Sequence, residues 1–270
     1  MHDSSNSQPL VSLIIACYNQ ATYLEKIFIS LLKQSFMDFE IVIADDGSGR
    51  ELADVINKYA GKYKNTILHV WHENSGFRKT IIANEAVRRS NSGYLIFIDG
   101  DCILHHKFIE RHFKRRKIKH VLSGRRIMFD QELTDKLTNE KVYNLEFERY
   151  KFWWSNCEPK DRNRGLYLPY IYKIVNMSSK QYWTFGSNFS IHKQDFIDVN
   201  GYEENIIGRG LEDINLSQRF KIKGYRIMKL TNEAIQYHLF HKSGTVPHSK
   251  ESMELIINPK NFYAVKGINN

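Results

Sequence analysis

The chain has 270 residues, of which 42% are apolar and 13% aromatic, enough for a folded core and too many for intrinsic disorder. Its formal charge of +9 is typical of proteins that meet nucleic acid, an anionic membrane face or phosphorylated substrates. Three widely spaced cysteines (Cys17, Cys102, Cys157) without a CxxC pair argue against a disulfide framework or a zinc site and fit a reducing compartment.

The ends of the chain carry few signals. Residues 1–8 are polar and lack the apolar stretch of a signal peptide, so we expect a flexible leader. No apolar run reaches the length of about 20 residues that a membrane span needs. The sequence therefore predicts a cytoplasmic protein that is soluble or at most peripheral on the inner membrane face.

Strand and helix patterns alternate from the leader onward. Short apolar runs rich in β-branched residues predict buried strands at 10–18, within 39–48, at 66–71 and from 94 to 99. Helices are predicted at 22–34, 51–59 and 79–90. This alternation indicates an α/β fold with a mainly parallel central sheet.

Polar clusters follow three of these predicted strands: Asn19-Gln20, Asp45-Asp46-Gly47-Ser48 and Asp99-Gly100-Asp101. In a parallel sheet, ligands bind beyond the carboxyl ends of the strands. We therefore expect the three clusters to line one site.

The pattern changes at about residue 131. Residues 131–180 are rich in charge and aromatics, and we interpret them as a loop-rich or helical insertion that is a candidate for movement. Apolar runs return at WTFGSNFSI, in a predicted helix at 212–223 and at YRIMKL.

The most informative motif is Asp99-Gly100-Asp101. Two carboxylates two residues apart on an extended strand point the same way and repel each other. A divalent cation, a shared proton or solvent at an ordinary strand end would each relieve this repulsion. Carboxylates suit Mg²⁺ or Mn²⁺, with phosphate oxygens filling other positions, and Gly100 lets a ligand approach closely. The motif alone leaves these alternatives open.

Two further acidic pairs have two interpretations each. Asp45 and Asp46 form an ordinary strand-to-helix turn, or one of them accepts a hydrogen bond from a nucleobase ring N–H. Glu212 and Asp213 follow paired glycines into the first turn of a helix. They are either acidic caps or include a general base for an acceptor hydroxyl.

Histidines and cations complete the set of candidates. His238 and His241 are three residues apart, so on a strand they would face opposite ways and only one would face the site. Arg78 and Lys79 begin a predicted helix, where their charges oppose the dipole. That indicates either a nearby anion or a solvated basic turn.

In order, seven segments resemble family 2 glycosyltransferases with the GT-A fold: SLIIACYN, LLKQSF, FEIVIADDGS, ENSGFRKTIIANEA, SGYLIFIDGDCI, GRGLEDINLSQRF and YHLFH. The resemblance covers about residues 10–245 and looks most like the bacterial branch near chondroitin polymerases and galactosyltransferase-type domains. It implies a Rossmann-like GT-A domain at 9–250, with a nucleotide-sugar-binding half (9–125), an acceptor-binding half (126–250) that contains the insertion 131–180, and a tail at 251–270.

The resemblance also implies an activity and residue roles. The activity is metal-dependent, inverting transfer from a UDP-sugar to a glycan or lipid-linked acceptor in surface polysaccharide or lipooligosaccharide synthesis. The donor side would include Ala16, Tyr18, Asp45 or Asp46 at the uracil, Arg78, Lys79, Asp99 and Gly100. Asp101 would bind Mn²⁺ (or Mg²⁺) with His238, and Asp99 would lie in the ribose and metal shell. Asp213 would be the base, Glu212 would hold the acceptor, and Trp183, Gly186 and Asn188 would line the acceptor site.

Other classes compete with this one. IFIDGDCI also resembles the nucleophile motif of haloacid-dehalogenase-type phosphatases, although that motif normally opens its domain. A non-catalytic GT-A domain that binds nucleotide is a further alternative, against which the complete set of charged groups argues. The basic charge would suit a nucleic-acid-binding domain, but the basic clusters are dispersed and no such motif is present, so we expect no nucleic acid. The cluster HFKRRKIKH is either a solvated helix face or a contact with an anionic membrane.

Overall fold

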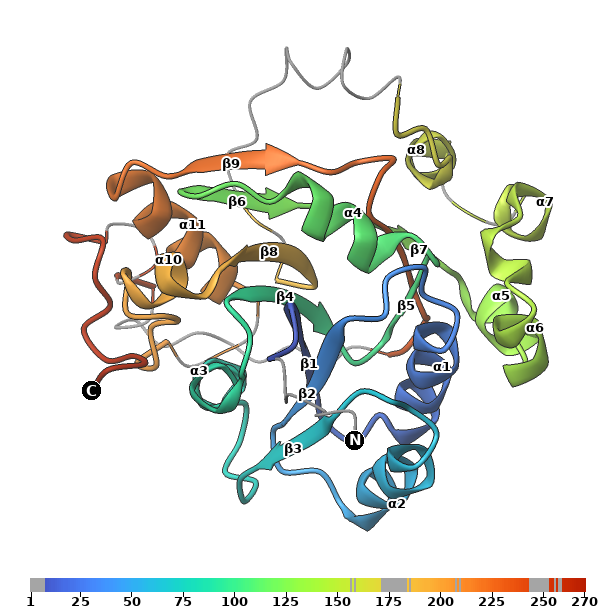
Figure 1. Cartoon of the computed structure of the whole chain (residues 1–270), viewed down its shortest axis with the longest axis horizontal. Coiled ribbons are helices and arrows are strands. Elements are labelled where there is room, and N and C mark those ends of the chain that lie inside the picture. Colours follow the sequence, from blue (N-terminus) through green and yellow to red (C-terminus); the bar gives the residue numbers. More distant parts are fainter. Residues whose placement is uncertain are drawn as a thin grey trace, which may run out of the picture.

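A seven-stranded sheet lies at the centre of the protein, in the order β3-β2-β1-β4-β8-β6-β9 (Figure 1). The computed structural model describes residues 8–155, 157, 159–170, 184, 186–206, 208, 210–242, 253, 254, 256 and 259–270. The strands are β1 (Val11–Cys17), β2 (Phe39–Asp45), β3 (Ile67–Trp71), β4 (Tyr94–Asp99), β6 (His120–Ser123), β8 (Asn188–His192) and β9 (Arg226–Lys229). Within this sheet, β8 is the only described strand that runs antiparallel to its neighbours, which confirms the predicted mainly parallel sheet.

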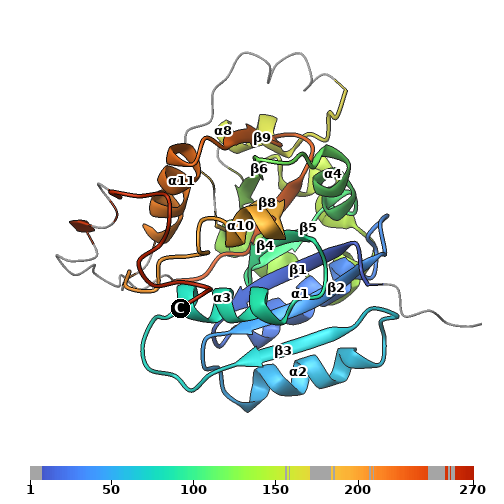
Figure 2. The same cartoon turned by 60° about the vertical axis from the view of Figure 1, so that its left-hand side comes forward.

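Helices cover both faces of this sheet because its inner strands are apolar on both faces. The main helices are α1 (Ala21–Leu31), α2 (Arg50–Ala60), α3 (Lys79–Arg89), α4 (Phe108–Arg115), α10 (Lys193–Ile197) and α11 (Glu212–Ile222). Within β1, Leu13 and Ile15 join the core under α1 and α2, and Ile14 joins the core under α3 and α11. Figure 2 shows β3 between α2 and α3. In the described part of the chain, no helix combines the length and apolarity that crossing a membrane requires.

A second, three-stranded sheet continues from the carboxyl end of β4. It contains β5 (Cys102–Leu104), β10 (Ile235–His238) and β7 (Arg125–Met128). The insertion follows β7 and is helical where it is described, with α5 (Gln131–Lys136), α6 (Asn139–Tyr143), η1 (Glu146–Glu148), α7 (Tyr150–Trp153), α8 (Pro159–Arg162) and η2 (Asn163–Gly165). Trp153 is fully buried in the main core, so this segment packs against the sheet.

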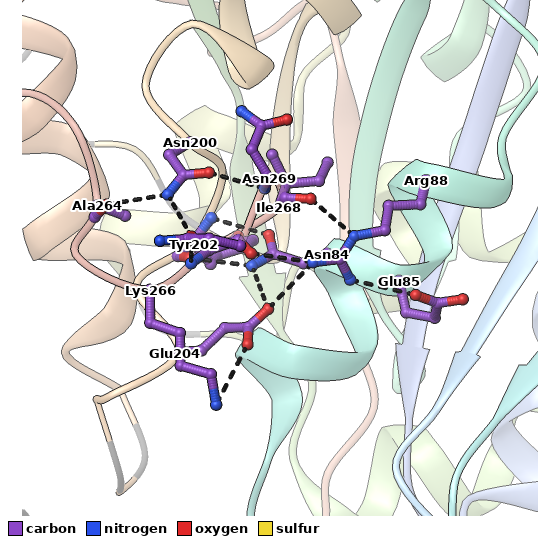
Figure 3. Close-up of polar contacts among 12 residues, drawn as sticks. Asn84, Glu85, Arg88, Asn200, Tyr202, Glu204, Ala264, Lys266, Ile268 and Asn269 are labelled. Carbon is purple, nitrogen blue, oxygen red and sulfur yellow. Dashed lines mark hydrogen bonds and ion pairs between the residues drawn. The ribbon is translucent and has the colours of Figure 1, made fainter.

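The end of the chain packs against α3, although its sequence has no regular pattern. Asn84 of α3 donates to Tyr202 O at 2.9 Å and accepts from the Tyr202 N–H at 2.9 Å (Figure 3). Arg88, one turn later, donates to the carbonyls of Gly267 and Ile268 at 2.9 and 2.8 Å. Backbone groups therefore hold the last residues beside the loop that leads towards α11.

Candidate active site

The carboxyl ends of β1, β2 and β4 meet at one edge of the sheet. The strand register pairs Cys17 with Asp45 and Ala16 with Asp99. The N–H of Gly100 donates to Ala16 O at 2.7 Å. A Cβ atom on Gly100 would lie 2.6 Å from the Cβ of Cys17, so this close approach requires glycine. The polar clusters thus lie together, as parallel strands dictate.

Asp101 lies between two histidines beyond β4. Its Oδ2 is 3.0 Å from His241 Nε2 and 3.5 Å from His238 Nε2. The Cys102 thiol donates to Asp101 Oδ1 at 3.0 Å, and Gln20 Nε2 donates to Oδ2 at 3.4 Å. Burial alone would raise the pKa of Asp101, but the hydrogen bonds from the two imidazoles outweigh it and hold the pKa well below its usual range. The ionised carboxylate is therefore favoured here.

The arrangement of the two histidines differs from the expectation that they face opposite ways. β10 ends at His238, and the chain then leaves strand geometry, so His241 also reaches Asp101. The three side chains offer one carboxylate oxygen and two imidazole nitrogens, all within 4.8 Å of one another. Such a donor set suits a divalent first-row metal ion.

Asp99 does not belong to this group of ligand atoms, although we expected it in the metal shell. Its Oδ1 lies 2.7 Å from Lys79 Nζ, and its Oδ2 lies 4.0 Å from Arg126 Nη1. Two cations thus relieve the charge of Asp99, and two histidines relieve that of Asp101. Each of the two acids thus has its own set of partners, and these partners reduce the repulsion between the two carboxylates.

Lys79 connects the two acidic parts of the site. Its Nζ is 2.7 Å from Asp99 Oδ1 and 3.6 Å from Glu212 Oε1. Burial would lower the pKa of Lys79, but the negative charges of Asp99, Glu212 and Asp213 outweigh it and raise the pKa well above its usual value. The ammonium therefore stays charged between β4 and α11.

Asp213 is held at the start of α11 through one of its two carboxylate oxygens. Its Oδ2 accepts the N–H of Gly186 at 2.8 Å, and its Oδ1 is buried without a partner among the described residues. A Cβ atom on Gly186 would lie 2.2 Å from Oδ1, so glycine is needed there. Burial first, and then the charge of Glu212, raise the pKa of Asp213 to about 7, while Lys79 opposes the shift. Gly210, with φ of 98°, donates its N–H to Glu212 at 2.7 Å.

Asp45 and Asp46 each have a histidine partner that sequence reasoning missed. His69 Nε2 lies 2.8 Å from Asp45 Oδ2, and His72 Nε2 lies 2.6 Å from Asp46 Oδ1. The N–H of Arg78 donates to Asp46 Oδ2 at 2.9 Å. These acids are therefore fixed at the edge of the sheet. In the sequence, only the place of these histidines near the end of the predicted strand at 66–71 indicated that they could lie at the site.

The side chains around these acids are only partly where we expected them. Arg78 turns its guanidinium to the carbonyl of Glu73, so its backbone, and not its charge, contacts Asp46. Tyr18 is exposed, and its hydroxyl accepts from Asn74 Nδ2 at 2.7 Å. The exposed Trp71 donates to Ser48 O at 3.2 Å. The rings of Tyr18 and Trp71 are thus exposed to solvent beside Asp45 and Asp46.

The expected acceptor residues are distributed differently. Trp183 lies outside the described residues, and Gly186 contacts Asp213. Asn188 is fully buried and uses its amide internally. It donates to the carbonyls of Arg125 and Ala234, each at 3.1 Å, and its Oδ1 lies 3.0 Å from His112 Nε2. Asn188 therefore holds β7, β8 and β10 together and is not open to an acceptor.

A second group of potential metal ligands, His105, His106 and Glu148, is better explained as a structural contact. The Lys107 N–H donates to His105 Nδ1 at 3.1 Å, so the proton of the neutral ring is on Nε2, towards Glu148 at 3.5 Å. Burial lowers the pKa of His105 to about 4, which favours this neutral form. Glu148 also accepts from the N–H and Nδ1 of His106 at 2.6 and 2.5 Å. This contact fixes η1 to the start of α4.

Comparison of the sequence with the profiles of known protein families identifies the family. Residues 12–178 match the profile of glycosyl transferase family 2, and residues 175–242 match that of the N-terminal domain of galactosyltransferase. The first match covers more than half of the chain, so the protein belongs to glycosyl transferase family 2 and is a glycosyltransferase. This assignment replaces the phosphatase alternative.

Individual proteins agree with the family and with the GT-A fold. The chain is 25% identical over 238 residues to validoxylamine A glucosyltransferase of Streptomyces hygroscopicus subsp. jinggangensis, a match that covers 83% of this chain and 54% of that protein. The fold is similar to mannosyltransferase PcManGT from Pyrobaculum calidifontis in complex with GDP-Man and Mn²⁺, with a TM-score of 0.60, 13% identity and coverage of 89% and 59%. It is also similar to S. aureus TarS 1–349 in complex with UDP-GlcNAc, with a TM-score of 0.53, 19% identity and coverage of 87% and 60%. The chain thus spans about half the length of this curated relative.

Proposed function

We propose that the protein transfers a sugar from a UDP-sugar to a glycan or lipid-linked acceptor, with inversion of the anomeric centre, in the synthesis of a surface polysaccharide or lipooligosaccharide. Two proteins of similar fold carry a nucleotide sugar, one GDP-Man with Mn²⁺ and one UDP-GlcNAc, which supports a nucleotide-sugar donor. The resemblance of the motif order to bacterial UDP-sugar enzymes supports uridine as the base.

The donor would lie across the carboxyl ends of β1, β2 and β4. Asp46, or its neighbour Asp45, would accept the N–H of the uracil ring, beside Ala16 and Tyr18. Histidines hold both carboxylates in place, which supports recognition of the uracil ring by a carboxylate in a fixed position. Asp99 would lie near the ribose, where Lys79 holds it.

Asp101, His238 and His241 would hold a divalent cation, Mn²⁺ or Mg²⁺. The residues fit such an ion, because one carboxylate oxygen and two imidazole nitrogens converge within 4.8 Å of one another. When bound there, the ion supplies positive charge that stabilises a departing diphosphate. Cys102 and Gln20 hold the carboxylate in position.

Asp213 would take the proton of the acceptor hydroxyl. Its Oδ1 has no described partner, and a pKa of about 7 suits a base that works near neutral pH. The hydroxyl oxygen would bond to the anomeric carbon as the bond from that carbon to the diphosphate breaks. A single base on the side opposite the leaving group gives inversion. Glu212 would orient the acceptor sugar.

The observation that carries this proposal is the position of Lys79, which links Asp99 on the donor side to Glu212 beside the base. The test is Asp213→Asn, assayed for UDP release from UDP-sugars with Mn²⁺ and for donor binding by thermal shift. Transfer should fall by about 10² to 10⁴-fold with donor binding retained. Asp54→Asn, at an exposed surface pair, is the matched control. Near-normal transfer by Asp213→Asn would remove Asp213 from this role.

We also propose a cytoplasmic location with peripheral contact to an anionic membrane. The formal charge of +9 supports attraction to such a surface, and lipid-linked acceptors reside there. Sedimentation with anionic and neutral vesicles tests the contact, and equal binding to both would contradict it.

A further inference from the structure

The basic stretch HFKRRKIKH divides into two parts in the structure. Its helical part uses its cations internally: Lys114 Nζ lies 2.5 Å from Glu110 Oε1, and Arg115 Nη2 lies 3.1 Å from Glu233 Oε1. In the turn at 116–119, by contrast, no ion pair forms with any residue that the structure describes, although Arg116 Nη1 donates to Phe113 O at 2.7 Å and its guanidinium lies 3.6 Å from the centre of the Phe113 ring. Within this basic stretch, the turn is therefore the part whose cations have no described carboxylate partner.

The turn has a defined shape and exposes an isoleucine at its tip. Ile118 is 69% exposed. Lys119 adopts a left-handed φ of 59°, its N–H donates to Asp195 Oδ2 at 2.7 Å, and its carbonyl accepts the N–H of Arg226 at 3.1 Å. This last bond joins it to the start of β9, four residues after Ile222, which ends α11 and is 51% exposed.

Four exposed cations accompany these two isoleucines, and we call the six residues the basic ridge: Arg116, Lys117, Ile118, Lys119, Ile222 and Arg226. The carboxylates beside the ridge are engaged elsewhere. Asp195 is buried against the N–H of Lys119, and Asp198 accepts from Gln194 and Tyr225. The ridge therefore combines apolar side chains with positive charge that nearby acids leave available.

The strand directions place the basic ridge at the edge of the sheet opposite the candidate active site. β4 and β6 are both antiparallel to β8, so they run in the same direction. Asp99 ends β4, whereas the ridge lies just before β6 and at the start of β9. A strand of six residues such as β4 spans about 20 Å.

We propose that the basic ridge docks the protein on an anionic membrane leaflet, with Ile118 and Ile222 entering the interfacial region and the four cations contacting lipid headgroups. Apolar side chains amid cations gain free energy in this way at a bilayer surface. Single-stranded nucleic acid, in contrast, is bound through aromatic rings that stack on bases, and the ridge has none. This inference rests on the proposed function in one respect, the contact with an anionic membrane. The surface that makes the contact is new.

Docking through the basic ridge has a consequence for the acceptor. The active-site edge then faces away from the bilayer, by roughly the length of β4, about 20 Å. The acceptor is therefore a glycan long enough for its reactive end to reach the active site from the leaflet. A sugar directly at the lipid headgroup would not reach it.

The test is flotation of the full chain with vesicles of phosphatidylcholine alone and with added phosphatidylglycerol. We expect binding to the anionic vesicles only. Lys117→Glu reverses one charge and should weaken binding about 25-fold, since each cation contributes about fivefold. Lys151→Glu makes the same charge change on α7, outside the ridge, and should alter binding less than about twofold. Ile118→Asn should also weaken binding.

Absent binding, or equal loss for Lys117→Glu and Lys151→Glu, would overturn the proposal. Ridge-dependent binding to a DNA oligonucleotide that exceeds binding to anionic vesicles would overturn it in favour of a nucleic-acid partner. Release of UDP from a UDP-sugar in solution should be unchanged by Lys117→Glu. Vesicle binding and transfer are thus measured separately, and failure of one does not imply failure of the other.

Discussion

The ammonium of Lys79 lies 2.7 Å from Asp99 Oδ1, an ion pair between the first residue of α3 and the last residue of β4. The same ammonium is 3.6 Å from Glu212 Oε1 on α11. The chain thus places one largely buried cation, with a side chain 16% exposed, among the acids of the donor side and those of the acceptor side. Lys79 therefore links the proposed donor side of the site to the proposed acceptor side.

Lys79→Met should reduce kcat/KM by about 100-fold, because it leaves Asp99 and the buried Glu212 without their shared cation. It should also shift the acidic limb of the pH–rate profile to higher pH, since the charge of Lys79 lowers the pKa of Asp213. Lys79→Arg retains the charge and should show the smaller shift in the profile. A Lys79→Met enzyme with the wild-type profile would contradict the connection.

Gly186→Ala should abolish transfer while donor binding persists, because the added Cβ would lie 2.2 Å from Asp213 Oδ1 and displace it. Gly93→Ala is the matched control, since its Cβ meets no atom within 4 Å. UDP release and a donor thermal shift measure the two properties separately. Equal activity of the two variants would show that Asp213 need not keep this position.

The pH dependence should follow Asp213, whose pKa burial raises to about 7. Transfer should fall below about pH 7 as the base becomes protonated. The stability that protonation of this group provides is complete below its usual pKa, near 4, and is lost as the pH rises through about 7. Asp213→Asn should therefore gain stability relative to the wild type between pH 4 and 8, on the order of 1–4 kcal/mol. Urea unfolding at both pH values checks this, and a pH-independent difference would count against it.

Arg88→Ala should lower the free energy of unfolding by about 1–3 kcal/mol, because the carbonyls of Gly267 and Ile268 lose their charged donor. Arg89→Ala removes an exposed pair with Glu85 and should cost less than about 0.5 kcal/mol. Denaturant unfolding of both variants makes the comparison. Similar values for the two would mean that the end of the chain does not stabilise the fold through α3.

Periodicity and strand ends explain why much of the fold was predictable. The helix predicted at 79–90 is found at Lys79–Arg89, and that predicted at 212–223 at Glu212–Ile222, because apolar spacing records which face is buried. The position of Asp45 and Asp99 on either side of β1, at the same edge of the sheet, followed from parallel strands alone.

The remaining features depend on contacts that leave no local pattern. His241 reaches Asp101 because the chain leaves β10 after His238, and strand alternation does not describe that turn. Asn188 seemed a possible acceptor residue, but buried hydrogen bonds between strands fix it. The last residues are held through backbone carbonyls, whose positions no side-chain pattern shows.

The most direct test of the central claim, metal-dependent use of a UDP-sugar at Asp101, His238 and His241, is a thermal-shift panel of UDP-sugars with Mn²⁺ or with EDTA. We expect Tm to rise only when Mn²⁺ and one UDP-sugar are present together, and His241→Ala to lose that rise. An equal rise in EDTA, or an unchanged response of His241→Ala, would contradict the claim.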